Sequence, residues 1–145
     1  MEPRMLAGVI ALVGLLAVVL AACGDGEEDA EQTVHISLTE WSIAGEPGHP
    51  ISTIDTGKVT LEVHNDGKVL HELVIIKTDL AAGRLPVKEA KVDEDAAGEV
   101  IGEVEEFDAG KIETATFDLE SGRYVFVCNI AGHYQQGMFA EVTVQ

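Results

Sequence analysis

Near its C-terminus the chain reads Cys128-Asn-Ile-Ala-Gly-His133-Tyr-Gln-Gln-Gly-Met138. This stretch carries a thiol, an imidazole and a thioether in the pattern Cys-x4-His-x4-Met. The run Tyr124-Val-Phe-Val127 leads into it, and residues 138–144 lead out of it. β-branched and aromatic residues are frequent in both flanks, which is typical of β-strands. We therefore expect the three side chains to lie on a tight loop that joins the last two strands.

A thiolate, an imidazole and a thioether together suit a soft-to-borderline redox metal, above all copper. A blue-copper site also needs a second histidine. The best placed is His71, on the apolar run His71-Glu-Leu-Val-Ile-Ile76. We predict a strand over residues 69–76, and its nearly continuous apolar character indicates that both of its faces are covered.

With His71, Cys128, His133 and Met138 in this order, the sequence resembles the cupredoxins, the blue-copper electron carriers that include plastocyanin, azurin and rusticyanin. The resemblance covers about residues 33–145. It implies one type 1 copper site that cycles between Cu(I) and Cu(II), with Cys128, His71 and His133 in a trigonal plane and Met138 as a weak axial ligand. The sequence departs from the pattern at Glu72, where several small cupredoxins have an asparagine or serine that ties the ligand segments together.

Alternating apolar residues continue the strand pattern upstream, as in Val59, Leu61 and Val63. Short strands separated by turn signals and without repeats predict an all-β, Greek-key β-sandwich of about eight strands. A short helical or irregular excursion is expected around residues 79–98, with residues 87–97 as a short helix, and Trp41 is expected to fill the core. The predicted strands are 34–39, 51–54, 59–63, 69–76, 100–107, 112–119, 124–128 and 138–144.

The N-terminal residues 1–22 have the features of a signal peptide, because a continuous apolar segment over residues 6–20 follows Arg4. The segment ends in Leu-Ala-Ala-Cys23, which resembles the bacterial lipobox and implies lipidation of Cys23. An ordinary signal peptide or a transmembrane anchor are the alternatives. Residues 23–32 are acidic and predict a lipidated tether, and residues 33–145 form the expected cupredoxin domain. We thus expect a lipid-anchored protein on the periplasmic or outer cell-surface face of a bacterial membrane.

The formal net charge is −17, which makes nucleic-acid binding improbable. It favours a redox partner with a basic docking patch, such as a cytochrome or a terminal oxidase. If the lipid occupies Cys23, Cys128 has no disulfide partner, and metal ligation explains a lone thiol in an oxidising compartment. His35, His49 and His64 lie outside the ligand pattern, and we expect their side chains to be solvated. We expect a monomer.

Enzymatic functions are not indicated. Multicopper oxidases and copper nitrite reductases place a histidine beside the copper cysteine, whereas Val127 and Asn129 flank Cys128 here. The dinuclear centre of terminal oxidases needs two cysteines in the loop. Two alternatives to an electron carrier remain: a copper carrier or buffer that delivers the ion to a cuproenzyme, and a metal-free interaction domain.

Overall fold

The computed structural model describes residues 32–46 and 51–145. The predicted signal peptide, Cys23, most of the predicted tether and His49 lie outside these residues. No helix in the two described segments is long and apolar enough to cross a membrane.

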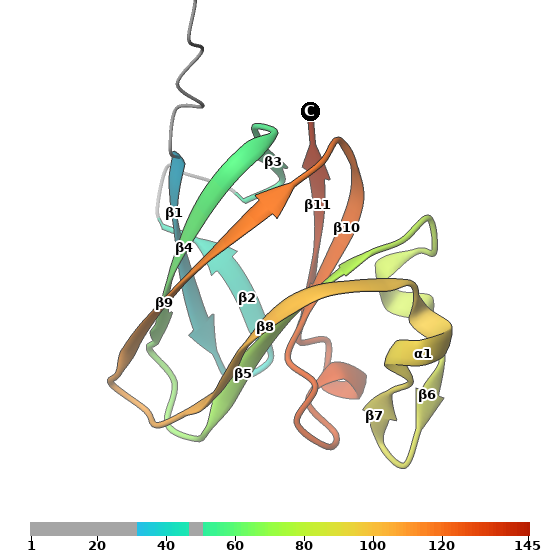
Figure 1. Ribbon diagram of the computed structural model, residues 1–145. Helices are drawn as coiled ribbons and strands as arrows, with labels where there is room; N and C mark the ends of the chain where they lie inside the picture. Colours follow the sequence, from blue (N-terminus) through green and yellow to red (C-terminus); the bar gives the residue numbers. More distant parts are fainter. Residues whose placement is uncertain (1–31, 47–50) are drawn as a thin grey trace, which may run out of the picture.

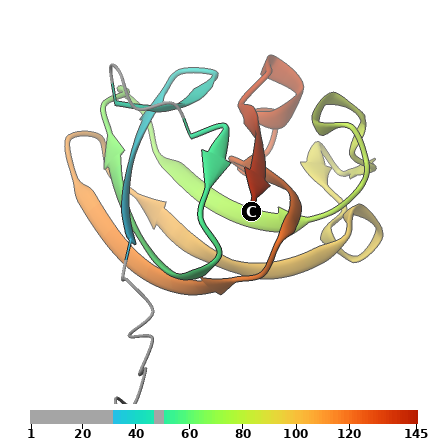
Figure 2. The ribbon, with the colours of Figure 1, turned by 90° about the horizontal axis from the view of Figure 1, so that it is seen from above.

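Two β-sheets pack face to face, as predicted for a β-sandwich (Figures 1 and 2). β1 pairs in parallel with β4, and β3 in parallel with β11, whereas the other pairings within these sheets are antiparallel. The first sheet has the order β2 (Ser42–Gly45), β1 (Gln32–Thr39), β4 (Gly57–Asn65) and β9 (Ile112–Leu119). The second has the order β3 (Thr53–Ile54), β11 (Phe139–Val144), β10 (Gly122–Val127), β5 (His71–Lys77) and β8 (Glu99–Phe107).

The alternation seen in the sequence defines the core between the sheets. Val59, Leu61 and Val63 of β4 are completely buried and face the inner side of β5, where Leu73 and Ile75 are also buried. Burying such side chains stabilises the fold by about 1.5–3 kcal/mol each.

The outer face of β5 and β10 is covered as well, which explains the continuous apolar run of β5. Residues between 78 and 98 and the loop after β10 pack on this face, in a second hydrophobic cluster. Its buried members are Val74, Ile76, Ala82, Leu85, Val92, Ala97, Val125, Val127 and Tyr134.

The excursion after β5 differs from the helix predicted over residues 87–97. It contains a 3-10 turn, η1 (Ala82–Arg84), a small hairpin of β6 (Val87–Lys88) and β7 (Lys91–Val92), and only then a short helix, α1 (Glu94–Ala97). Glu89 and Ala90 both have positive φ, the backbone of a two-residue hairpin turn. The helix prediction was therefore wrong for residues 87–93, because a turn forms where the sequence has no glycine to signal it.

Trp41 does not fill the core. It occupies the two-residue turn between β1 and β2 with φ 67°, and 43% of its surface is exposed. The residue that enters the core from this region is Ile43, on the unpredicted strand β2 and opposite Leu38. β5 begins at His71 rather than at Val69, which is exposed.

Candidate metal centre

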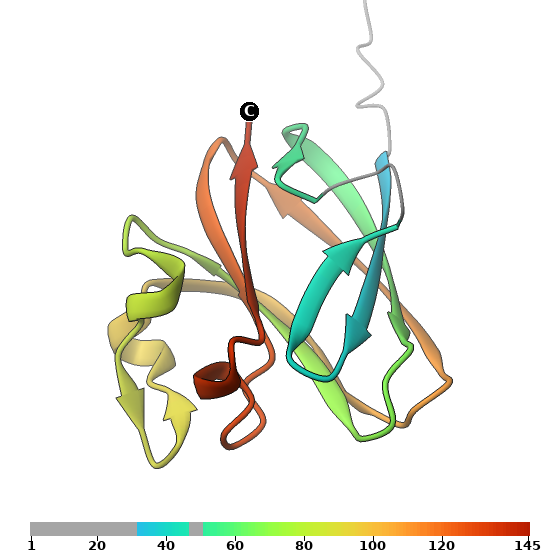
Figure 3. The same cartoon turned by 180° about the vertical axis from the view of Figure 1, so that it is seen from behind.

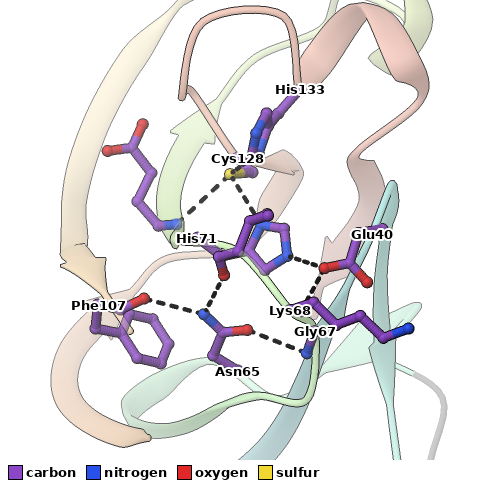
Figure 4. A network of polar contacts seen from close by, with 10 residues as sticks. Glu40, Asn65, Gly67, Lys68, His71, Phe107, Cys128 and His133 are labelled. Carbon is purple, nitrogen blue, oxygen red and sulfur yellow. Dashed lines mark hydrogen bonds and ion pairs between the residues drawn. The ribbon is translucent and has the colours of Figure 1, made fainter. Parts of the chain in front are cut away.

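Three of the four predicted ligands, His71, Cys128 and His133, lie close together (Figure 4). His71 opens β5, and Cys128 directly follows β10. His133 and Met138 lie on the loop 128–138, which contains the 3-10 turn η2 (Tyr134–Gln136). The Nδ1 atom of His71 lies 3.8 Å and that of His133 lies 3.3 Å from Cys128 Sγ. The three donor atoms are all within 4.8 Å of one another, so a single ion could contact all of them.

The backbone of the loop brings Met138 back to Cys128. The Cys128 N–H donates a hydrogen bond to the Met138 carbonyl at 3.1 Å, and the Met138 N–H donates to the His133 carbonyl at 3.2 Å. Gly137 ends η2 in the left-handed conformation, at φ 101°, which an L-residue adopts only with strain. The Met138 side chain is fully buried in the same cluster as Cys128. The thioether is thus shielded from solvent and would be available as a further donor to a metal held by Cys128.

Burial controls the protonation of the donors. It lowers the pKa of His71, with a further contribution from nearby His133, and it lowers the pKa of His133 itself. A lowered pKa favours the neutral imidazole, which is the form that binds a metal. Burial raises the pKa of the Cys128 thiol, although backbone N–H groups of Glu72 and Ile130 oppose the shift. A metal must therefore displace the thiol proton when it binds.

The loop that precedes His71 is held by a buried asparagine. Asn65 Nδ2 donates to the carbonyls of Val69 at 2.9 Å and Phe107 at 3.0 Å, while its Oδ1 accepts from the Gly67 N–H at 3.1 Å. A Cβ at Gly67 would lie 2.7 Å from both His71 Nε2 and a Glu40 oxygen, so any larger residue there would force these side chains to shift. The position of the His71 ring is thus fixed by the chain around it.

Glu40 is the side chain that faces the second nitrogen of His71. His71 Nε2 is buried and has no hydrogen bond, and the nearest carboxylate oxygen, Glu40 Oε1, is 3.8 Å away. The same oxygen accepts a hydrogen bond from the Lys68 backbone N–H, which is the main reason why the pKa of Glu40 is lowered. A carboxylate beside the outer nitrogen of a ligand histidine tunes its basicity. No sequence pattern indicated this contact.

Glu72 and Asn129 connect the ligand segments to the residues around them, although Glu72 stands where several small cupredoxins have an asparagine or serine. The Glu72 backbone N–H donates to Cys128 Sγ at 3.5 Å. Asn129 Oδ1 accepts from the Val92 N–H at 2.6 Å, and its Nδ2 donates to the Val92 carbonyl at 3.2 Å and to Glu94 Oε1 at 2.7 Å. The ligand loop is therefore bound to β7 and α1 through the residue after the cysteine. A polar residue beside Cys128 was the only sequence signal.

A buried tyrosine and an exposed tryptophan lie next to His133. Tyr134 does not line the surface, because its ring is buried and its hydroxyl donates to the Ala82 carbonyl at 2.7 Å and accepts from the Leu85 N–H at 2.9 Å. Instead the exposed Trp41 contacts His133 edge to face, at 5.0 Å between ring centroids. Figure 3 shows the red loop 128–138 between the blue β1–β2 hairpin and the olive β6–β7 hairpin. His133 is the partly exposed member of the set, whereas His71, Cys128 and Met138 are buried.

The family model of copper-binding proteins of the plastocyanin/azurin family matches residues 46–145. The chain therefore belongs to this family, the cupredoxins, and binds copper. Cupredoxins in general carry electrons rather than catalyse reactions, and blue-copper electron transfer is the function that membership implies.

Solved structures agree on the fold. Reduced auracyanin from the photosynthetic bacterium Roseiflexus castenholzii matches with a TM-score of 0.60 and 24% identity, over 79% of this chain and 97% of that one. An azurin from Methylomonas sp. strain J matches with a TM-score of 0.55 and 16% identity, over 81% and 98%. Reduced rusticyanin matches with a TM-score of 0.51 and 22% identity, over 79% and 80%. Among curated proteins, no sequence matches this chain significantly.

Proposed function

We propose that His71, Cys128, His133 and Met138 hold one copper ion in a type 1 site, and that the protein shuttles single electrons between redox partners. The observation that carries this proposal is the convergence of two imidazole Nδ1 atoms on one buried thiol. A thiolate, two imidazoles and a weak thioether form the donor set of blue-copper sites. Copper, when bound there, accepts and releases one electron.

The residues around the site support an electron carrier because they restrict movement of the donors. Asn65 fixes the segment before His71, and Asn129 fixes the segment after Cys128. Ligands that stay in place in both oxidation states need little rearrangement per electron. The partly exposed His133 offers a short path from the site to the surface.

The alternative, a copper carrier or buffer, fits these features less well. A protein that releases its ion needs an accessible and labile site. Here His71, Cys128 and Met138 are all buried, and Met138 is the only methionine after residue 5. The residues beside Cys128 are Val127 and Asn129, whereas multicopper oxidases and copper nitrite reductases have a histidine there that connects to a second metal centre.

The test is the visible spectrum of the copper(II) protein and of its Cys128→Ser variant. The protein should show an intense thiolate-to-copper band that mild reductant bleaches, and the variant should lose the band and most of its copper affinity, since a hydroxyl cannot replace the soft thiolate. Gln136→Ala is the control, because Gln136 is exposed on the same loop. A strong band that persists in Cys128→Ser would rule out the proposed site.

We infer from the sequence that residues 1–22 are a cleaved signal peptide, that Cys23 is lipidated, and that residues 23–32 tether the domain 33–145 to an extracytoplasmic membrane face. Two or more acyl chains on one residue give stable anchoring. Cys23→Ala should move the protein from the detergent phase to the aqueous or unprocessed pool. Normal processing with unchanged partitioning would contradict lipidation.

We further propose that the protein is monomeric and that its redox partner carries a basic patch. Both Glu40 and Glu106 place negative charge near His133, and the whole chain carries −17. Exposed charges are screened over about 8–10 Å near physiological ionic strength. Electron transfer to a basic partner should therefore slow as salt rises, and transfer to an acidic partner should speed up. A flat salt response with both partners would contradict electrostatic steering.

A further inference from the structure

A second group of metal-binding side chains lies on the outer face of the sheet that contains β1 and β4. His35 Nδ1 is 3.1 Å and His64 Nε2 is 2.8 Å from the same oxygen of Glu62, Oε1. The three donor atoms are all within 4.8 Å of one another. The two imidazole rings stand edge to face, at 6.5 Å between centroids. His35 and His64 were expected to be solvated, but both side chains are only partly exposed and converge on Glu62.

The sheet itself holds these side chains together. His35 of β1 lies directly opposite Glu62 of β4 in the parallel pairing, and His64 follows Glu62 by two positions on the same face of β4. Val63, which lies between them, and Leu61, which precedes Glu62, are completely buried on the inner face and fix the orientation of β4. The cluster therefore rests on regular strands rather than on a loop, which favours a defined geometry.

Two imidazoles and one carboxylate form a donor set of Zn²⁺ sites, in which water takes the remaining position. Ligands of a tetrahedral Zn²⁺ ion at about 2.0–2.1 Å stand about 3.3–3.4 Å from one another. The two separations from Glu62 Oε1, 3.1 and 2.8 Å, need to open by about 0.2–0.6 Å to reach that spacing. The side chains are 41%, 35% and 28% exposed for His35, Glu62 and His64, so water can reach the open position.

We propose that His35, Glu62 and His64 form a second metal site, which binds Zn²⁺ at the surface and is separate from the copper centre. Its ligands come from β1 and β4 of one sheet, whereas those of the copper centre come from β5 and from the loop after β10 of the other. The net charge of −17 raises the local concentration of divalent cations and supports binding at an exposed site.

The competing interpretation is a simple pair of hydrogen bonds to Glu62. These bonds, first from His64 and then from His35, lower the pKa of Glu62, so the carboxylate is ionised at neutral pH. An ionised carboxylate with two imidazoles is also the state that a metal requires. The geometry serves both interpretations, and metal binding separates them.

The experiment is isothermal titration of Zn²⁺ into the copper-loaded protein, in which the copper centre is already filled. We expect one equivalent of Zn²⁺ to bind. His35→Gln and Glu62→Gln should each weaken binding by at least about tenfold, since even residues outside the ligand set commonly affect metal affinity by about 10–100-fold. The double variant His35→Gln/His64→Gln should lose the site, while the thiolate-to-copper band stays unchanged in all three.

Glu141→Gln is the matched control for Glu62→Gln. Glu141 also lies on a strand, pairs with Arg123 at 2.7 Å and carries the same charge, but belongs to the other sheet. Its variant should keep the Zn²⁺ affinity within about twofold. Absence of Zn²⁺ binding, binding that survives in the double variant, or equal losses in Glu62→Gln and Glu141→Gln would each overturn the proposal.

A second measurement on the unaltered protein does not depend on any variant folding. In the diamagnetic Cu(I) form, added Zn²⁺ should shift the NMR signals of the His35 and His64 rings and leave those of His71 and His133 in place. Zn²⁺-induced shifts confined to other residues would also overturn the proposal.

Discussion

Replacement of Asn129 by alanine should destabilise the protein and loosen its copper site together. Asn129 is buried and makes three hydrogen bonds with β7 and α1. Without its side chain the buried Val92 N–H has no acceptor, which costs about 1–3 kcal/mol, and each lost bond from Nδ2 contributes about 1 kcal/mol more. We expect a total loss of about 2–4 kcal/mol in the free energy of unfolding, because water can partly replace the bond to Glu94.

The consequence for copper arises from the position of Asn129, directly after the thiolate ligand. Once the hairpin β6–β7 no longer holds the start of the loop 128–138, Cys128 is less well oriented toward the two histidines. Residues that support metal ligands in this way commonly contribute about 10–100-fold to metal affinity. We expect a loss in that range for Asn129→Ala.

Urea unfolding of the copper-free protein measures the first effect, and competition with a copper chelator measures the second. Gln135→Ala is the matched control, since it removes the side-chain amide of an exposed residue on the same loop. Substitutions of that kind change stability by about 0.5 kcal/mol or less. If Asn129→Ala behaves like Gln135→Ala in both assays, Asn129 does not tie the loop to β7, and the reasoning is refuted.

Three further predictions concern the neighbours of the copper site. Met138→Leu should keep the colour and raise the reduction potential, because it removes a weak donor to Cu(II). Met138→Gln should lower the potential. Redox titrations without a shift in either variant would show that Met138 is not a ligand. Glu40→Gln should raise the potential, because it removes the negative charge 3.8 Å from His71 Nε2; an unchanged or lower value would mean that this carboxylate does not act on the site. Copper(II) should quench the fluorescence of Trp41, the only tryptophan, which contacts His133; undiminished emission on loading would contradict that contact.

The strand faces and the clustering of the donors could be predicted from the sequence because both depend on local patterns. The alternation Val59, Leu61, Val63 has the period of a strand with one buried face, and all three are buried. Cys128 and His133 are close in sequence and lie between two recognisable strands. His71 needed the family resemblance, because nothing in its own segment specifies a partner nearly sixty residues away.

The features that escaped prediction depend on contacts between distant segments. The turn at Glu89 and Ala90 has no glycine, so the hairpin that accepts Asn129 was taken for a helix. Trp41 was expected in the core because large aromatic residues usually gain most from burial. Its place in a two-residue turn follows from the pairing of Ile43 with Leu38, which the sequence does not reveal.

The copper centre is a property of the whole sandwich and not of its C-terminal loop. The β1–β2 turn contributes Glu40 beside His71 and Trp41 beside His133, so one hairpin contacts both histidines. Asn65 fixes the approach to β5 from the end of β4, and Asn129 fixes the loop against β7. These contacts come from four segments that are far apart in the sequence. Together these contacts limit the movement of His71, Cys128 and His133, so the restraint that suits an electron carrier is distributed over the fold. An isolated loop with the same Cys-x4-His-x4-Met pattern would lack that restraint.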